Sequence, residues 1–396
     1  MQRIGRFEVL GHLASGGMGQ VYLAKTTGLG GFERQVVVKT LDVDDEDDPY
    51  VTMFLDEARL VGALHHQYIA PVYEVGRDET GRYFLVMDYI RGETAEKLWK
   101  RATERGEPLA LSLALTIVRA IASALAYAHA LDAPDGTPLE IVHRDVSLSN
   151  IMIGYDGGVK LIDFGIAKSA GRATRTQVGT LKGKFGYLAP EQVLQKPIDR
   201  RADIFALGVV LYELTTMQRA FVASSELLTL ERITKGEVVL PSRHDPKYPR
   251  GLELIVMKAL AVDPTNRFQT AVELAREVEA FAKRSDVALG DVPVAEAMTA
   301  MFGNGRRLAT GTKRISQLGP VAKEPAAPEE IQDQELTVPL DASSAIVIEC
   351  ELGAHAGGPP TVTAEIAHER PSWRGFWIAV GLVATAAVIA IVLGLT

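Results

Sequence analysis

Cysteine is scarce in this chain of 396 residues, and acidic residues outnumber basic ones. The one cysteine, Cys350, cannot form an internal disulfide, which suits a reducing compartment. The formal net charge of −8 argues against nucleic acid as a partner, because phosphate binding requires a basic surface. Residues 1–13 lack the apolar run of a signal peptide, so we expect a strand there. No repeat of fixed period is present, which argues against a repeat architecture.

Apolar residues make up 47% of the chain, enough for a sizeable core. Short β-type runs come early, at residues 7–13, 20–25, 35–41 and 83–89. Apolar residues at helical spacing follow, at residues 111–130, 204–214, 252–260 and 271–282. This order predicts an α+β, two-lobed fold with a small, mainly β N-terminal lobe and a larger, mainly α C-terminal lobe. A turn-rich stretch at residues 132–139 predicts a surface hairpin.

The composition changes after residue 284. Residues 285–372 are rich in Ala, Pro, Gly and Glu and predict a flexible, disordered linker. Residues 376–395 carry no charge, and a helix of this length spans the ~30 Å of a bilayer core. We therefore expect three parts: a globular domain at 1–284, the linker, and one transmembrane helix at 373–396.

Charges near this apolar segment predict its orientation. Arg370 and Arg374 precede it, and positive residues remain on the cytoplasmic side. We expect a single-pass protein of the cell inner membrane whose globular domain is cytoplasmic. Small residues in the segment, such as Gly381 and Ala390, would let two such helices pack closely, so a homodimer is one alternative to a monomer.

Two motifs carry the strongest chemical signal: His143-Arg-Asp-Val-Ser-Leu-Ser-Asn150 and Asp163-Phe-Gly165. With a glycine-rich run at 14–21, Val36-Val-Val-Lys39 and Ala189-Pro-Glu191, they occur in the order of a protein kinase. Over residues 5–283 the chain resembles the bacterial eukaryotic-like (Hanks-type) Ser/Thr protein kinases. The resemblance implies transfer of the γ-phosphate of ATP to Ser or Thr hydroxyls of proteins, with Mg²⁺, or alternatively Mn²⁺, as the metal.

The resemblance assigns the nucleotide site to the N-terminal lobe and the connection that follows it. Lys39 would hold the α- and β-phosphates, with Glu57 as its counter-charge. Ala14 stands where the family has its first glycine, and Val37 replaces the usual alanine against adenine. Met87 would be the gatekeeper. The expected ATP-binding residues are Leu13, Ala14, Ser15, Gly16, Gly17, Met18, Gly19, Gln20, Val21, Val37, Lys39, Met87, Asp88, Tyr89 and Ile90.

The catalytic residues are also assigned by resemblance. Asp145 would accept the proton of the acceptor hydroxyl, while Asn150 and Asp163 would bind the metal. A metal is needed because carboxylates alone would repel a phosphoryl group. Structural roles fall to a bracing aspartate and an ion pair: Asp203, and Glu191 with Arg267.

Two other classes of protein share part of this pattern. Small-molecule antibiotic kinases also have a His-x-Asp motif, but Arg144, Ala189-Pro-Glu191 and Asp203 favour a protein kinase. A pseudokinase would bind without catalysis. Ser147 favours it mildly because the family has lysine there, whereas the complete set of catalytic residues opposes it.

The segment between Asp163 and Glu191 is the expected regulatory element. Arg144 beside the catalytic aspartate is typical of kinases in which phosphate orders this segment through charge-assisted hydrogen bonds. We expect autophosphorylation at Thr174 or Thr176, with Thr180 next.

One departure from the family leads to a prediction. Ser147 and Lys184 have exchanged the hydroxyl and the ammonium that the family places at these positions. We expect Lys184 to supply the missing positive charge, so Lys184→Ala should lower kcat by roughly two orders of magnitude with little change in KM for ATP. Steady-state kinetics should also show that Ser147→Lys with Lys184→Thr recovers much of the loss. A Lys184→Ala enzyme within about threefold of wild type contradicts the exchange.

Overall fold

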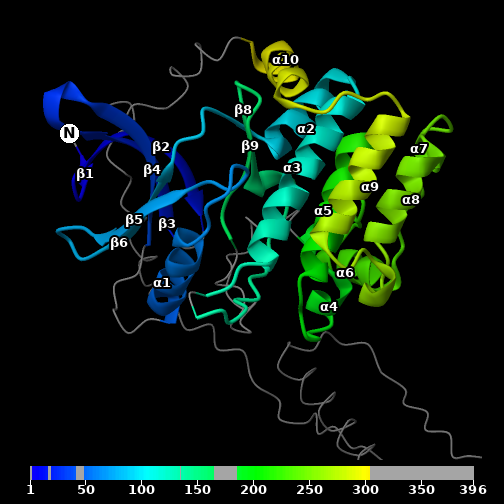
Figure 1. Ribbon diagram of the computed structural model, residues 1–396, viewed down its shortest axis with the longest axis horizontal. Coiled ribbons are helices and arrows are strands. Elements are labelled where there is room, and N and C mark those ends of the chain that lie inside the picture. The colour runs from blue at the N-terminus through cyan, green and yellow to red at the C-terminus, as the bar shows by residue number, and fades with distance from the viewer. Residues whose placement is uncertain (1, 17–18, 42–48, 134, 165–184, 304–396) are drawn as a thin grey trace, which may run out of the picture. The chain divides into compact units, whose positions relative to one another are not determined.

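The N-terminal lobe is built on a six-stranded antiparallel sheet in the order β1-β2-β3-β4-β6-β5 (blue in Figure 1). The computed structural model describes residues 2–16, 19–41, 49–133, 135–164 and 185–303. One helix, α1 (Pro49–Gly62), packs on β5. The strands are β1 (Arg3–Ile4), β2 (Phe7–Gly16), β3 (Gly19–Thr27), β4 (Glu33–Thr40), β5 (Val72–Arg77) and β6 (Tyr83–Asp88).

Buried and half-buried side chains alternate along β4 and so distinguish the two faces of this sheet. Val36 and Val38 are buried and pack with Phe7 and Phe84 in one apolar cluster. Because successive side chains in a strand point to opposite faces, Val37 and Lys39 lie on the other face. The sheet thus separates the residues that stabilise the lobe from those predicted to meet the nucleotide.

The C-terminal lobe is mainly helical and has its core around α3 and α5 (Figure 1). Helix α5 is buried along nearly all of its length, as expected for a helix with apolar residues on every side. A small sheet joins β7 (Gly92–Thr94), β8 (Ile151–Gly154) and β9 (Val159–Leu161). The main helices are α2 (Ala95–Arg105), α3 (Leu111–His129), α4 (Pro190–Val193), α5 (Arg201–Thr216), α6 (Glu226–Lys235), α7 (Pro241–His244), α8 (Arg250–Ala259), α9 (Ala271–Arg284) and α10 (Asp291–Phe302).

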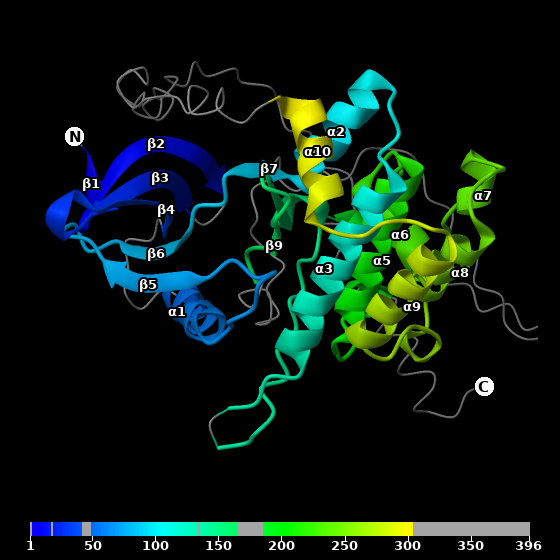
Figure 2. The ribbon, with the colours of Figure 1, turned by 45° about the horizontal axis from the view of Figure 1, so that its top comes forward.

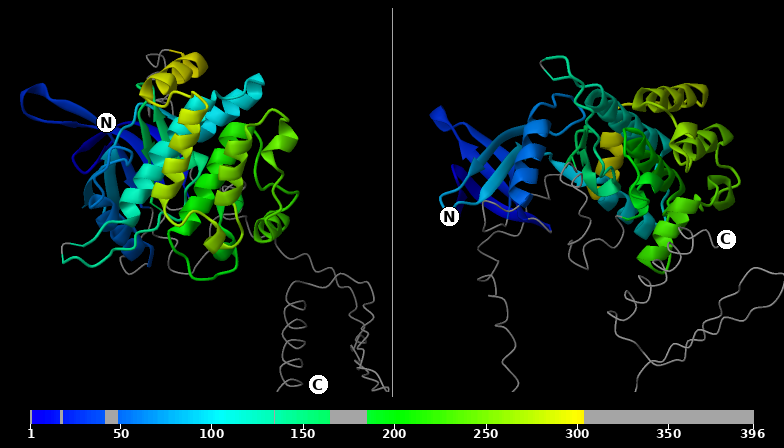
Figure 3. Two further views of the ribbon diagram at one scale, coloured as in Figure 1. Left: turned by 45° about the vertical axis from the view of Figure 1, so that its right-hand side comes forward. Right: turned by 90° about the horizontal axis from the view of Figure 1, so that it is seen from below.

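The two-lobed prediction is confirmed, and so are the strands and helices expected from periodicity, to within a few residues at their ends. The predicted hairpin also forms: Asp132 bridges Pro138, and the Ala133 amide donates to the Thr137 carbonyl at 2.8 Å. Figure 3 shows this hairpin projecting from the end of α3.

The structure differs from the predicted linker at its start. Residues 291–302 form helix α10, in which Val294 and Met298 are fully buried. Composition gave no sign of it, because a helix this short is stabilised by packing more than by its own sequence. The remainder of the linker and the predicted transmembrane helix at 373–396 lie outside the described residues. Among the described helices, α3 alone is long and apolar enough to cross a membrane, and most of it is buried in the lobe.

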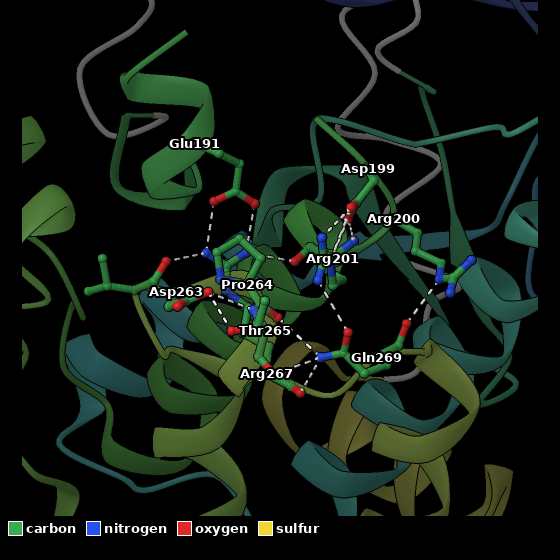
Figure 4. Close-up of polar contacts among 10 residues, drawn as sticks. Glu191, Asp199, Arg200, Arg201, Asp263, Pro264, Thr265, Arg267 and Gln269 are labelled. Carbon is green, nitrogen blue, oxygen red and sulfur yellow. Dashed lines mark hydrogen bonds and ion pairs between the residues drawn. The ribbon is translucent and has the colours of Figure 1, made fainter. Parts of the chain in front are cut away.

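A fully buried ion pair fixes the chain just after Ala189-Pro-Glu191 (Figure 4). Glu191 accepts from Nη1 and Nη2 of Arg267 at 2.7 and 2.8 Å. The other three guanidinium N–H groups donate to the carbonyls of Ala261, Arg201 and Val262. All five donors of this arginine are therefore satisfied, which a buried guanidinium requires.

This pair yields a prediction about stability. Arg267→Ala leaves Glu191 buried without its partner, so we expect the free energy of unfolding to fall by about 3–5 kcal/mol. Arg201→Ala is the matched control, because its side chain pairs with the half-exposed Asp199 and such a pair contributes under about 1 kcal/mol. Urea unfolding followed by circular dichroism measures both. Equal, small losses for the two variants would show that Glu191 finds another partner.

Candidate active site

Two predicted site residues meet where the lobes join. Lys39 Nζ lies 3.1 Å from Oδ1 of Asp163, although the two are 124 positions apart in the sequence. Asp163 follows β9 closely and has a φ of 54°, in the left-handed region. A non-glycine residue there carries strain of about 1–3 kcal/mol, which typically marks a functional position.

The motif from His143 to Asn150, here called the catalytic loop, brings two more predicted site residues together. Nδ2 of Asn150 donates to the carbonyl oxygen of Asp145 at 2.8 Å and to its Oδ2 at 2.9 Å. The amide of Ile162 donates to the carbonyl of Asn150 at 2.9 Å, which joins the loop to the residue before Asp163. The catalytic loop is thereby tied to the stretch of chain that carries Asp163.

Asp203 braces this loop from inside the lobe. Its carboxylate is 1% exposed and accepts from the amides of His143 and Arg144, both at 2.8 Å. His129 Nε2 lies 2.8 Å from the same carboxylate. Arg144 has a φ of 65°, and these bonds hold it in that strained conformation.

His143 links the loop to the segment that carries Asp163. Burial lowers the pKa of His143, so the ring is neutral at pH 7. Its Nδ1 accepts from the Asp145 amide at 3.2 Å, which leaves the proton on Nε2 to be donated to the Ile162 carbonyl at 3.3 Å. The ring also packs on Phe164, with 4.5 Å between the ring centres.

The described residues of the glycine-rich run, 14–16 and 19–21, pair at the adjoining ends of β2 and β3. Ala14 pairs with Val21, and Val21 pairs in turn with Lys39 of β4, so the run begins and ends beside the lysine in the sheet. Ser15 Oγ donates to Gln20 Oε1 at 2.7 Å across the two strands. A Cβ on Gly19 would lie 1.7 Å from the carbonyl oxygen of Thr40, so glycine is required there.

The connection between the lobes follows β6. Met87 pairs with Val37 across the sheet, which places the predicted gatekeeper beside the residue expected to meet adenine. The Asp88 amide donates to the Pro71 carbonyl at 3.0 Å, and its carboxylate accepts from Tyr73 at 2.9 Å. Tyr89 and Ile90 come next, before β7.

Several predicted residues lie outside the description. Glu57 belongs to α1, but its side chain is not among the described ones. Gly17, Met18, Thr174, Thr176, Thr180 and Lys184 are outside the described residues altogether. Their roles stay predictions.

Ser147 is 2% exposed, and its hydroxyl lies 2.9 Å from that of Ser149. Its short side chain is held against the catalytic loop by this hydrogen bond, so the position offers no cation beside Asp145.

A buried network that the sequence did not reveal lies beside residues 185–191, the described end of the segment between Asp163 and Glu191, here called the activation segment. Tyr187 Oη donates to Glu213 Oε2 at 2.6 Å, and Arg219 Nη1 donates to the same oxygen at 2.7 Å. The guanidinium stacks on Trp99 at 4.2 Å, and Trp99 Nε1 donates to the Glu213 carbonyl. Burial raises the pKa of Glu213, and the positive charge of Arg219 opposes that shift. A carboxylate inside the apolar helix α5 was the one available signal.

The residues present suit Mg²⁺ and a nucleotide. Asp163 and the side-chain oxygen of Asn150 are hard oxygen ligands, which Mg²⁺ prefers, and phosphate oxygens normally complete its shell. Among the described residues, no group of three or more His, Cys, Asp or Glu could hold a metal by itself.

Comparison with known proteins gives the same assignment. Residues 7–278 match the family described as the protein kinase domain. The tyrosine-protein kinase MasK of Myxococcus xanthus is 39% identical over 307 residues, 77% of this chain and 47% of MasK. The serine/threonine-protein kinase PrkC of Bacillus subtilis is 34% identical over 276 residues, 69% of this chain and 40% of PrkC.

A solved structure is similar as well. The crystal structure of the Mycobacterium tuberculosis PknI kinase domain superposes with a TM-score of 0.52 at 26% identity, covering 70% of this chain and 97% of that one. This chain spans less than half the length of MasK and PrkC. The family match covers more than half of the chain, and the chain belongs to the protein kinase family.

Proposed function

We propose that this chain is an ATP- and Mg²⁺-dependent protein kinase that phosphorylates Ser and Thr hydroxyls of proteins and acts in bacterial signalling. The observation that supports it best is the contact of Lys39 with Asp163, and the bond from Asn150 to the Asp145 carboxylate supports it as well. PrkC, which is similar over most of this domain, is named a serine/threonine-protein kinase.

In this proposal each residue has a defined role. Lys39 binds phosphate oxygens, and Asn150 and Asp163 hold the metal, which neutralises charge on the phosphates when bound. Asn150 also orients the carboxylate of Asp145 through its bond to Oδ2. Asp145 accepts the proton as the acceptor oxygen bonds to the γ-phosphorus and the bond to the ADP oxygen breaks. Mn²⁺ suits the same oxygen ligands.

Tyrosine is a second candidate acceptor. MasK, which is similar over 77% of this chain, is named a tyrosine-protein kinase. Ser147 stands where the family has lysine, so the long side chain of that lysine is absent from the catalytic loop. A phenol is larger than the hydroxyl of Ser or Thr, so it would gain most from that absence.

We further propose that residues 373–396 anchor the protein in the cell inner membrane with the kinase domain in the cytoplasm. The uncharged segment 376–395 and the preceding Arg370 and Arg374 support it. We also propose that the protein forms a homodimer through this segment. Separately, we propose that it autophosphorylates at Thr174 or Thr176.

Removing a metal ligand or the base tests the main proposal. Asp163→Asn and Asp145→Asn should each lower phosphotransfer by roughly three orders of magnitude with the fold intact, because each removes one charge from the reaction centre. Labelled ATP and a generic protein substrate measure the rate. Asp135→Asn is the control, since this exposed aspartate accepts from the Thr137 amide within the surface hairpin. Wild-type rates for a folded Asp163→Asn enzyme would reject the proposal.

Phosphoamino-acid analysis tests the choice of acceptor. Matched peptides with Ser, Thr or Tyr at one position should show phosphate on Ser and Thr. If Tyr is also accepted, Ser147→Lys should lower the Tyr-to-Thr rate ratio by about tenfold, since the longer side chain fills the space for the ring. Ser149→Ala is the control, because it removes a hydroxyl from the same loop without adding a long side chain, and it should leave the ratio unchanged. An unchanged ratio in Ser147→Lys would show that this position does not select the acceptor.

A further inference from the structure

Helix α10 lies outside the residues that match the kinase family, yet it packs on the kinase domain. The family match ends at residue 278, within α9, and α10 begins at Asp291. It contacts α2, α3 and β8 (Figure 2). The chain therefore runs back from α9 to the small sheet that follows the connection between the lobes.

Both ends of α10 are held by specific bonds. At its start, the Gly290 amide donates to Thr116 Oγ1 at 3.2 Å. At its end, Arg105 of α2 donates to the carbonyls of Ala300 and Met301 at 3.4 and 3.2 Å. A helix leaves its last carbonyls without partners, so this arginine caps α10.

Side chains complete the contact. Val294 and Met298 are fully buried in the core of the C-terminal lobe. The guanidinium of Arg101, also from α2, lies 5.1 Å from the centre of the Phe302 ring. Val292, on the same helix, is 68% exposed and takes no part. The docked face of α10 is thus distinct from its solvent face.

The first residue of α10 is in close backbone contact with the turn between β8 and β9. A Cβ on Gly157 in that turn would lie 2.0 Å from the carbonyl oxygen of Asp291, so the two backbones touch. Nearer to β8, the Tyr155 amide donates to the carbonyl of Arg91, which lies just before β7, at 3.0 Å. The turn is held between α10 and the connection to the N-terminal lobe.

The other end of the same hairpin carries the predicted metal ligands. β8 begins directly after Asn150, and β9 ends two residues before Asp163. β7, β8 and β9 have only 3, 4 and 3 residues, and so small a sheet needs packing on another element to be stable. Helix α10 is one of the elements that supply this packing.

We propose that α10, which Arg101 and Arg105 hold in place, positions Asn150 and Asp163 for the metal. It does so by packing against the β8–β9 hairpin and restricting its motion, which we call clamping. Arg101 and Arg105 are positioning residues, because they act through α10 and not on the substrate. When α10 leaves its place, the hairpin loosens and the spacing of the two ligands varies. The inference rests on the proposed phosphotransfer function for its kinetic effect, but its effect on the hairpin is independent of activity.

The test uses the full chain with Val294→Glu/Met298→Glu, which places charges in the docked face of α10. Val292→Glu is the matched control on the exposed face of the same helix. Hydrogen exchange without nucleotide should become at least about tenfold faster in α10 and in residues 151–161, but not in α5. The Mg²⁺ concentration for half-maximal phosphotransfer should rise roughly 3- to 10-fold, a usual range for coupling through packed elements.

Arg105→Ala provides a milder second variant, in which the core face is intact and only the cap is lost. It should show the same changes at smaller size, and Arg105→Lys should restore part of the protection. The KM for the protein substrate should stay within about twofold in every variant, since the clamp acts on the metal ligands.

Two results would overturn the inference. Fast exchange in α10 with unchanged exchange in residues 151–161 and unchanged Mg²⁺ dependence would mean that α10 contributes stability alone. An α10 that stays protected in the double variant would mean that other contacts dock it. If the wild-type chain transfers no phosphate, the proposed function fails, while the exchange data still decide whether α10 clamps the hairpin.

Discussion

The buried carboxylate of Asp203 is the interaction on which the rest of the site depends. Two backbone amides of the catalytic loop, at His143 and Arg144, donate to it, and His129 lies at hydrogen-bond distance. A charge inside an apolar lobe is tolerated only when it is fully hydrogen-bonded. The carboxylate therefore requires the loop amides as donors, and the loop requires the carboxylate to keep its conformation. Because α5 is buried along its length, the core fixes Asp203, and Asp203 fixes the loop.

Buried polar groups continue this pattern beyond the loop. The Glu191–Arg267 pair holds the chain after Ala189, and the Glu213–Tyr187–Arg219 network holds the residues just before it. Both networks attach a non-helical connection to helices of the core. A break in either would leave a buried charge without a partner, which is strongly destabilising. Polar bonds therefore specify where the described end of the activation segment lies.

The small sheet connects these fixed points to the N-terminal lobe. Ile69 bridges Leu161 of β9, and the Leu161 amide donates to the Tyr68 carbonyl at 2.8 Å. On its other side β8 pairs with β7, which follows the connection from β6. The hairpin that ends at Asn150 and Asp163 thus touches both lobes and α10. Its short strands make it the part of the site most dependent on its neighbours.

The sequence by itself determined the class of fold and the family, and it named the residues that are expected at the site. Periodicity separates strands from helices because side-chain spacing is a local property, and the motif order around Asp145 and Asp163 is typical of one family. Tertiary structure alone decided the contact of Lys39 with Asp163, the tautomer of His143 and the docking of α10. Each of these depends on groups far apart in the chain, and burial, which sets the pKa of His143 and stabilises α10, exists only after the chain has folded.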